Sequence, residues 1–72
     1  MKVSYVAFGQ HVKSISAMRI GERYAGTGTI FSMDFKQDYL LIDLKDESGK
    51  AVQIVVPSSN IAFMQIILEV TK

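Results

Sequence analysis

The sequence predicts an all-β domain, and three observations support this fold class. Short segments rich in β-branched and aliphatic residues recur along the chain, and several alternate apolar with polar positions as half-buried strands do. Glycine, proline and small polar clusters separate these segments at turn-like spacing. Beyond the N-terminal segment no stretch shows helical periodicity. The length of 72 residues predicts a single domain, residues 1–72.

The N-terminal segment, residues 3–8, fits two interpretations. Val3, Val6 and Ala7 would share one face of a helix, whereas the alternation of Val3, Tyr5 and Ala7 suits a strand. We expect a short helix that ends at the following glycine, with a strand as the alternative.

Five later segments are expected to be strands. The segment YLLIDLK is the clearest, because its leucines and isoleucine fall on one face. A segment with two glycines flanked by threonines indicates a strongly bent strand. The expected strands are residues 14–20, 24–34, 39–45, 51–56 and 61–70, and the expected turns are residues 21–23, 46–50 and 57–60.

Five short, bent antiparallel strands with short links suit a small barrel, either SH3-like or OB-like. A domain of this length buries only about 60% of the surface that its unfolded chain exposes, so its core is marginal. The chain has no cysteine for a disulfide, and the single histidine, His11, cannot build a zinc site. Association with other copies is therefore the expected source of additional stability.

The net charge of +1 argues against a strongly basic, sequence-indifferent nucleic-acid binder. Residues 1–36 carry five basic and two acidic side chains, whereas residues 37–72 carry three basic and five acidic ones. An assembly could therefore present two differently charged faces, although scattered solvating charge is the alternative. The apolar runs are far shorter than the roughly 20 residues of a membrane span, and no signal peptide is evident. We expect a cytoplasmic protein.

Two segments resemble the motifs of the Sm and Sm-like (LSm) family. The first family motif has glycine, then an aliphatic residue, a large apolar residue, aspartate, methionine, asparagine and leucine at fixed offsets. Five of these seven positions match by type here, while glutamine replaces the methionine and aspartate replaces the asparagine; the residues at those offsets are Gly28, Ile30, Met33, Asp34, Gln37, Asp38 and Leu41. Residues 56–64 keep the apolar spacing of the second motif but lack its arginine and glycine.

The resemblance implies a five-stranded, strongly bent barrel that assembles into a homo-oligomeric ring of about five to seven subunits. In such rings the fourth strand of one subunit pairs with the fifth strand of its neighbour. The matching segments here, residues 51–56 and 61–70, contain no proline or lysine that would protect a lone edge. The expected subunit interface comprises Val52, Ile54, Val56, Ile61, Phe63, Met64 and Ile66.

The resemblance also implies a pore that binds single-stranded nucleic acid, RNA above all, with a role in RNA or DNA processing. The positions that match the family's binding residues are Lys36, Asp38 and Pro57. Lys36 would contact phosphate, and Phe35, one residue earlier, would stack on a base. The expected contacts also include Ser58, Asn60 and a basic patch of Arg19 and Arg23. The alternative roles are turn formation for Asp38 and the neighbouring Asp34, capping of the 57–60 connection for Asn60, and solvated charge for the arginines.

The sequence also bears on two other classes of function. A protein-interaction or structural module on an SH3-like barrel would use the strand edges, or a surface formed by Tyr5, Phe8 and Tyr24. An enzyme is not expected, because the chain offers no cysteine nucleophile and its lone His11 belongs to no triad. Residues 21–28 lack the Gly-Lys-Ser/Thr of a phosphate-binding loop. No cofactor or resident metal is expected, since two loop carboxylates are weak support for a cation site.

Overall fold

The computed structural model describes residues 1–68, which form seven strands and one short 3₁₀-helix. The strands are β1 (Val3–Val12), β2 (Ile15–Arg19), β3 (Arg23–Tyr24), β4 (Gly28–Phe35), β5 (Tyr39–Lys45), β6 (Ala51–Pro57) and β7 (Ile61–Ile66), and the 3₁₀-helix η1 (Ser58–Asn60) links the last two. The predicted all-β class is confirmed, since this part of the chain contains no α-helix. It likewise contains no helix with the length and apolar character needed to cross a bilayer.

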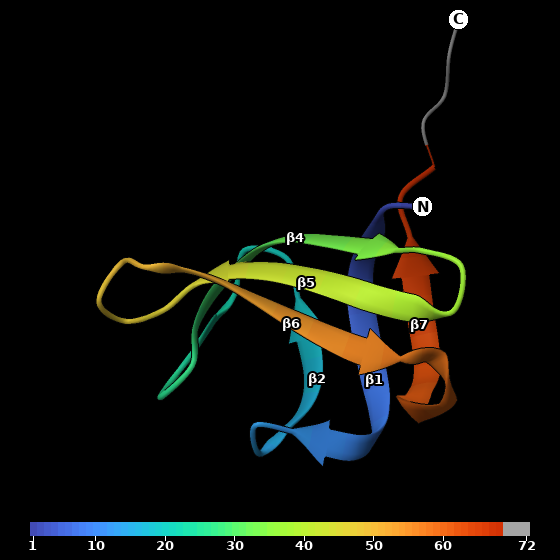
Figure 1. The fold of residues 1–72 in the computed structure, drawn as a ribbon, viewed down its shortest axis with the longest axis horizontal. Coiled ribbons are helices and arrows are strands. Elements are labelled where there is room, and N and C mark those ends of the chain that lie inside the picture. The colour runs from blue at the N-terminus through green and yellow to red at the C-terminus, as the bar shows by residue number, and fades with distance from the viewer. Residues whose placement is uncertain (69–72) are drawn as a thin grey trace, which may run out of the picture.

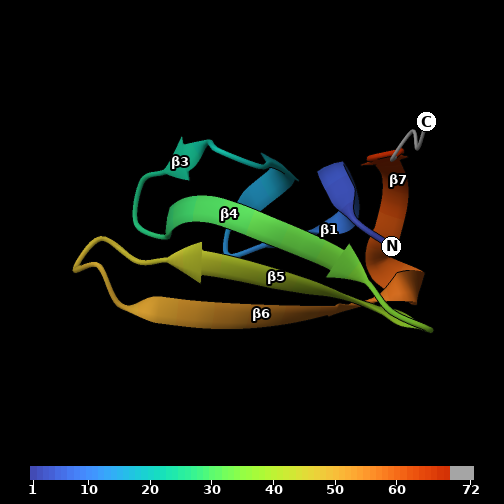
Figure 2. The ribbon, with the colours of Figure 1, turned by 90° about the horizontal axis from the view of Figure 1, so that it is seen from above.

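The strands form two antiparallel sheets that pack face to face. One sheet has the order β2-β1-β7 and the other the order β3-β4-β5-β6. Figure 1 shows β5 and β6 running in front of β1 and β2, and Figure 2 shows the two layers from above. The apolar core lies between them and consists of Val3, Val6, Phe8, Met18, Ile30, Met33, Leu40, Ile42, Leu44 and Val56.

Backbone hydrogen bonds connect β4 to the segments that follow β2 and precede β1. The N–H of Gly21 donates to the carbonyl of Ile30 at 2.7 Å, and the N–H of Ile30 donates to the carbonyl of Glu22 at 3.1 Å. At the other end of β4, the N–H of Phe35 donates to the carbonyl of Met1 at 2.8 Å. On the opposite side β6 pairs only with β5 and β7 only with β1. The sheets therefore do not close, and the opening lies between β6 and β7.

The expected N-terminal helix is wrong, because residues 3–8 belong to β1. This strand is the centre of its sheet and pairs with β2 on one side and β7 on the other. The pairing with β7 is irregular between Val3 and Tyr5, so Val3 and Val6 both reach the core although three positions separate them. That irregularity produces the spacing that resembled a helix.

The number of strands also differs from the prediction. Each of the five expected segments contains a strand, but β1 is additional, and the expected strand 24–34 is interrupted by a turn between β3 and β4. Gly26 in that turn has a φ of +78°, a value that favours glycine. Strand β7 ends at Ile66, four residues before the expected end, and residues 69 and 70 lie outside the described part of the chain.

Other local predictions are confirmed. Leu40, Ile42 and Leu44 share the buried face of β5. The 46–50 turn joins β5 to β6, and Gly49 in it has a φ of +86°. Asp46 holds this turn, since its Oδ1 accepts the N–H groups of Ser48 and Lys50 at 3.0 and 2.8 Å. The Ser48 hydroxyl also donates to Oδ1 at 2.7 Å, and this bond is the largest cause of the lowered pKa of Asp46, followed by the backbone N–H of Lys50.

Candidate nucleic-acid interface

The structure brings the 36–38 loop and the 57–60 link together at one end of the second sheet. Tyr39 pairs with Pro57 at the end of the β5–β6 ladder. Just beyond this pair, the N–H of Ser58 donates to the carbonyl of Asp38 at 3.0 Å. Asp38, Pro57 and Ser58 are all exposed, as is the nearby Lys36, whose side chain extends to Asp34. Two loop segments separated by about twenty positions in sequence thus meet.

The side chain of Asn60 joins η1 to β1 through two hydrogen bonds. Its Oδ1 accepts the N–H of Gln10 at 2.6 Å, and its Nδ2 donates to the carbonyl of Gln10 at 3.0 Å. The side-chain amide thereby takes the place of a strand partner for Gln10. These bonds join Asn60 to β1 and not to the 57–60 connection, where η1 has no side-chain cap. An open pocket of about 620 Å³ lies beside it, lined by Gly9, Gln10, Pro57, Ser59 and Asn60.

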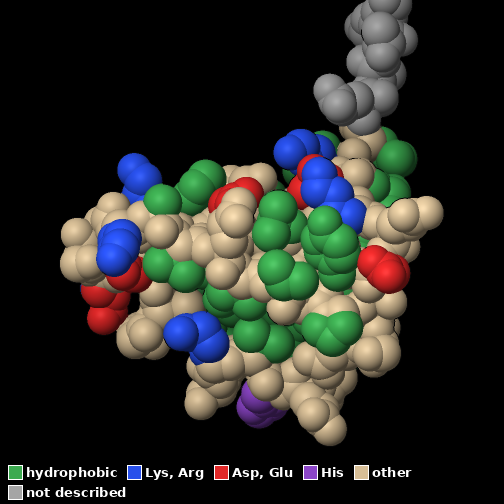
Figure 3. Space-filling view, viewed as in Figure 1, with side chains coloured by type: hydrophobic (Ala, Val, Ile, Leu, Met, Phe, Trp, Pro, Cys, Tyr) green, Lys and Arg blue, Asp and Glu red, His purple; other side chains and the backbone are tan. Residues whose placement is uncertain are grey.

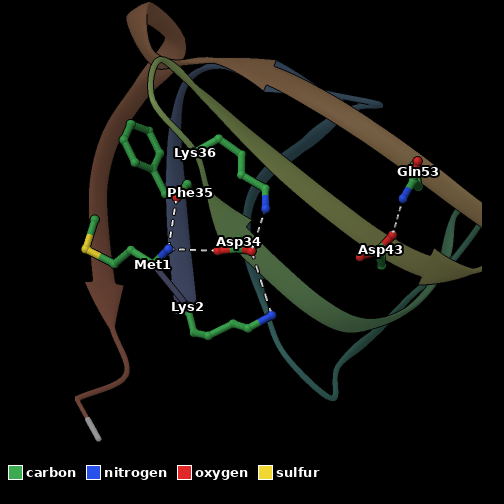
Figure 4. Close-up of polar contacts among 7 residues, drawn as sticks. All are labelled: Met1, Lys2, Asp34, Phe35, Lys36, Asp43 and Gln53. Atoms are coloured by element: carbon green, nitrogen blue, oxygen red, sulfur yellow. Dashed lines mark hydrogen bonds and ion pairs between the residues drawn. The ribbon is translucent and has the colours of Figure 1, made fainter.

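Asp34 binds three cationic groups, as Figure 4 shows. Its Oδ1 lies 2.8 Å from the amino group of Met1, and its Oδ2 lies 3.0 Å from Nζ of Lys36 and 3.8 Å from Nζ of Lys2. The hydrogen bond from the Met1 amino group, followed by the one from Lys36, lowers the pKa of Asp34 to about 2. Asp34 therefore acts as a link between β4 and the start of the chain.

Lys36 and Phe35 are placed differently from the predictions. The Lys36 amine donates to Asp34, which raises the pKa of Lys36, and 44% of its side chain stays exposed. It can reach a phosphate only by sharing or leaving that carboxylate. Phe35 is half-buried and packs against the core, so its ring is not free to stack on a base.

Arg19 and Arg23 do not form one basic patch, because their side chains turn to different partners. The Arg23 guanidinium lies 3.4 Å from Oε2 of Glu47, in the turn between β5 and β6. The Arg19 guanidinium instead lies over the ring of Tyr5, 4.6 Å from its centroid. The expected surface of Tyr5, Phe8 and Tyr24 is not formed either. Phe8 is buried in the core, and Tyr24 is half-buried with its hydroxyl accepting the N–H of Arg19 at 2.8 Å. Burial is the largest cause of the raised pKa of Tyr24.

The expected interface residues divide into two groups. Val56 is buried, and four others are half-buried against the core, namely Val52, Ile54, Ile61 and Met64. Their side chains contribute to the interior of the domain, while the backbones of their strands line the opening. Only Phe63 and Ile66 expose their side chains, at 54% and 41%.

Sequence reasoning missed Val55, which is 60% exposed on the outer face of β6. Val55 pairs with Leu41 across the β5–β6 ladder, and both lie opposite the core face. The 46–50 turn fixes this register. Counting forward through it from the buried face of β5 would have placed Val55 on the outer face. On the same face, Gln53 donates to Asp43 at 2.8 Å (Figure 4).

Comparisons with protein-family models, curated proteins and solved structures find no match. The fold and the site define a class: an all-β domain of two stacked sheets, open between β6 and β7, with two loops joined at one end. Within residues 1–68, no three histidine or acidic side chains are grouped as a metal site would require.

Proposed function

We propose that the chain is an Sm-like small barrel that assembles head to tail into a ring and binds single-stranded nucleic acid, RNA above all. The opening between β6 and β7 is the observation that carries this proposal. Each of these strands uses one edge within the chain and leaves its other edge unpaired. Unpaired edges of apolar strands favour pairing with another chain. Because the two free edges belong to different strands, repeated β6-to-β7 pairing can close a ring.

Exposed apolar side chains beside the two edges support the pairing. Val55 lies on β6 and Ile66 lies on β7, and their side chains are 60% and 41% exposed. In Figure 3 hydrophobic side chains gather over β5 and β6 on the face turned to the viewer. Pairing would extend each sheet into its neighbour and reduce the contact of these side chains with water.

The joined loops supply the proposed nucleic-acid contact. Asp38 and Ser58 are joined by a backbone hydrogen bond, and Lys36, Asp38, Ser58 and Ser59 are all exposed. A ring would bring several copies of these residues around one axis, so weak contacts from each copy would add. The role proposed is binding rather than catalysis. The absence of cysteine from the chain supports an intracellular location.

Native mass spectrometry of edge variants tests the assembly. The wild type is expected to give one species of about five to seven chains. Val55→Lys on β6 and Ile66→Lys on β7 are each expected to give monomers, because a lysine on an edge strand opposes pairing. Ser16→Lys is the matched control, since Ser16 is exposed on β2, an edge strand that the proposal leaves unpaired. This variant should keep the wild-type mass.

Mixing the two lysine variants distinguishes head-to-tail from symmetric pairing. Each variant keeps one intact edge, so a one-to-one mixture should form a mixed dimer that grows no further. A dimer of either variant alone would show that like edges pair, and a wild-type monomer at tens of micromolar would refute the ring.

The nucleic-acid part is tested separately by titrating a fluorescent U-rich or A-rich oligonucleotide. Its affinity should fall steeply with salt, and Lys36→Gln should weaken it.

A second candidate function is a protein-interaction module on the same barrel. It is favoured by the apolar outer face of β5 and β6, where Tyr39 pairs with Pro57 and Leu41 pairs with Val55. Oligonucleotide binding that is absent, or that does not change with salt, would favour this candidate.

A further inference from the structure

The outer face of the β2-β1-β7 sheet carries an arrangement that the joined loops do not use. Two rows of side chains point away from the core there. Arg19, Tyr5 and Gln65 form one row, and Ala17, Ala7 and Phe63 form the other. Their neighbours Val6 and Met18 are fully buried, and Met64 packs against the core, which fixes the outward direction of the rows.

Two aromatic rings and a guanidinium are packed together on this face. The rings of Tyr5 and Phe63 meet edge to face, with centroids 6.2 Å apart and planes at 61°. The guanidinium of Arg19 covers the Tyr5 ring at 4.6 Å. The contacts with Tyr5 fix Arg19 on one side of it and Phe63 on another, which reduces the entropy lost on binding a ligand.

The surroundings leave both groups accessible. Ala7 and Ala17 are small, so nothing on their row covers the Phe63 ring, which is 54% exposed. Arg19 is exposed and takes part in none of the ion pairs found within residues 1–68. Among the six side chains of the two rows one is a cation and none is an anion. The face therefore combines an apolar aromatic surface with a single positive charge.

We propose that Phe63, Tyr5 and Arg19 form a second contact for single-stranded nucleic acid, in which a base stacks on Phe63 and Arg19 binds a neighbouring phosphate. This assignment rests on the proposed function only in taking nucleic acid as the ligand. A stacked base needs an exposed aromatic ring, and its phosphate needs a cation a short distance away. The centroid distances place the Arg19 guanidinium no more than 10.8 Å (4.6 plus 6.2) from the Phe63 ring centre.

The position relative to the strand edges makes this contact compatible with assembly. Pairing at β7 uses backbone groups along its free edge, whereas the rows lie on the face of the sheet. A nucleic acid bound on this face would therefore leave the backbone groups along the free edge of β7 available for pairing.

Fluorescence anisotropy with a labelled twelve-residue oligouridine or oligoadenosine at low salt tests the contact, and the chain offers two matched controls. Phe63→Leu should weaken binding at least about fivefold, the lower end for loss of one stacked base. Phe31→Leu is its control, because Phe31 is 52% exposed but lies on β4. Arg19→Gln should weaken binding and lower the slope of log affinity against log salt by about one. Arg23→Gln is its control, since Arg23 is paired with Glu47. Both controls should bind as the wild type does.

Photo-crosslinking of the wild type with a 5-iodouridine oligonucleotide provides a readout that does not depend on folding of any variant. A crosslink to Phe63 or Tyr5, located by mass spectrometry of peptides, is expected. Crosslinks confined to residues 35–38 and 57–60, or unchanged affinity of Phe63→Leu and Arg19→Gln, would overturn this contact and leave the proposed function standing. Equal losses in the control variants would also overturn it. A wild type that binds neither oligonucleotide would refute nucleic-acid binding altogether.

Discussion

Gly28 begins β4 beside the end of β5, next to Lys45 and Asp46. It is buried and has a φ of +132°, a conformation that residues with a side chain rarely adopt. A Cβ at this position would overlap the carbonyl oxygen of Lys45 and lie 2.8 Å from Cα of Asp46. The absence of a side chain at Gly28 thus allows β4 to pass close to the adjoining turn and cover the core.

Gly28→Ala is expected to destabilise the domain by about 3 kcal/mol or more, from backbone strain and steric overlap together. Gly49→Ala is the matched control, because Gly49 also has a positive φ but a Cβ there would meet nothing within 4 Å. The control should cost only about 1–2 kcal/mol. Urea denaturation followed by circular dichroism measures both. Equal losses for the two variants would show that the close approach to Lys45 is unimportant.

At the scale of elements, the two sheets depend on a few cross-links as well as on the core. Asp34 on β4 binds the amines of Met1, Lys2 and Lys36 and so connects the start of the chain to the second sheet. At the other end, Glu47 accepts the Gly26 N–H at 3.2 Å and contacts Arg23, which connects the β5–β6 turn to the β3–β4 turn. These contacts hold the ends of strands whose centres are held by the core.

Stability should fall as the pH drops from about 4 to about 2. The pKa of Asp34 is about 2 in the folded chain, below the ordinary value of 3.8, so the unfolded chain takes up its proton first. The stabilisation that the Asp34 carboxylate provides is therefore complete above pH 3.8, and it is lost as the pH falls to the folded-state pKa of about 2. Asp34→Asn should reduce this dependence in thermal melts at several pH values. Part of it should remain, because Asp46 also has a lowered pKa. An unchanged pH profile in Asp34→Asn would contradict the role of the carboxylate.

At the scale of the whole molecule, the opening between the two sheets leaves one edge of β6 and one edge of β7 unpaired. The core is small, and several large apolar side chains remain exposed within residues 1–68, including Phe31, Val55, Phe63 and Leu68. A closed ring would protect the edges of β6 and β7 and add stability through mass action.

The melting temperature of the wild type should consequently rise with protein concentration, by about 5 °C for each tenfold increase. Val55→Lys should melt at a temperature that does not depend on concentration, because this variant is expected to be monomeric. Differential scanning fluorimetry from one to one hundred micromolar checks this. A wild-type melting temperature that stays constant over this range would contradict assembly.

Local features of the fold could be predicted because they depend on neighbouring residues. The alternation in residues 39–45 identified β5 and its buried face, and the polar cluster with Gly49 identified the turn after it. The resemblance placed the 36–38 loop and the 57–60 link in one site, and the structure joins them through Asp38 and Ser58. It did not anticipate that Lys36 would bind Asp34 or that Phe35 would pack inward.

By itself the sequence determined the all-β class, the 46–50 turn and the approximate positions of five segments that contain strands, because alternation and turn chemistry act over a few residues. The tertiary structure alone decided that residues 3–8 form the central strand of a sheet, since an irregular pairing with β7 sets which side chains reach the core. It also decided the grouping of Arg19 and Tyr5, from the adjacent strands β2 and β1, with Phe63 from β7, which is distant in sequence. The order in which strands pair depends on long-range contacts and on the burial of the whole core. It cannot be predicted from the periodicity of one segment, because that pattern reflects only neighbouring residues.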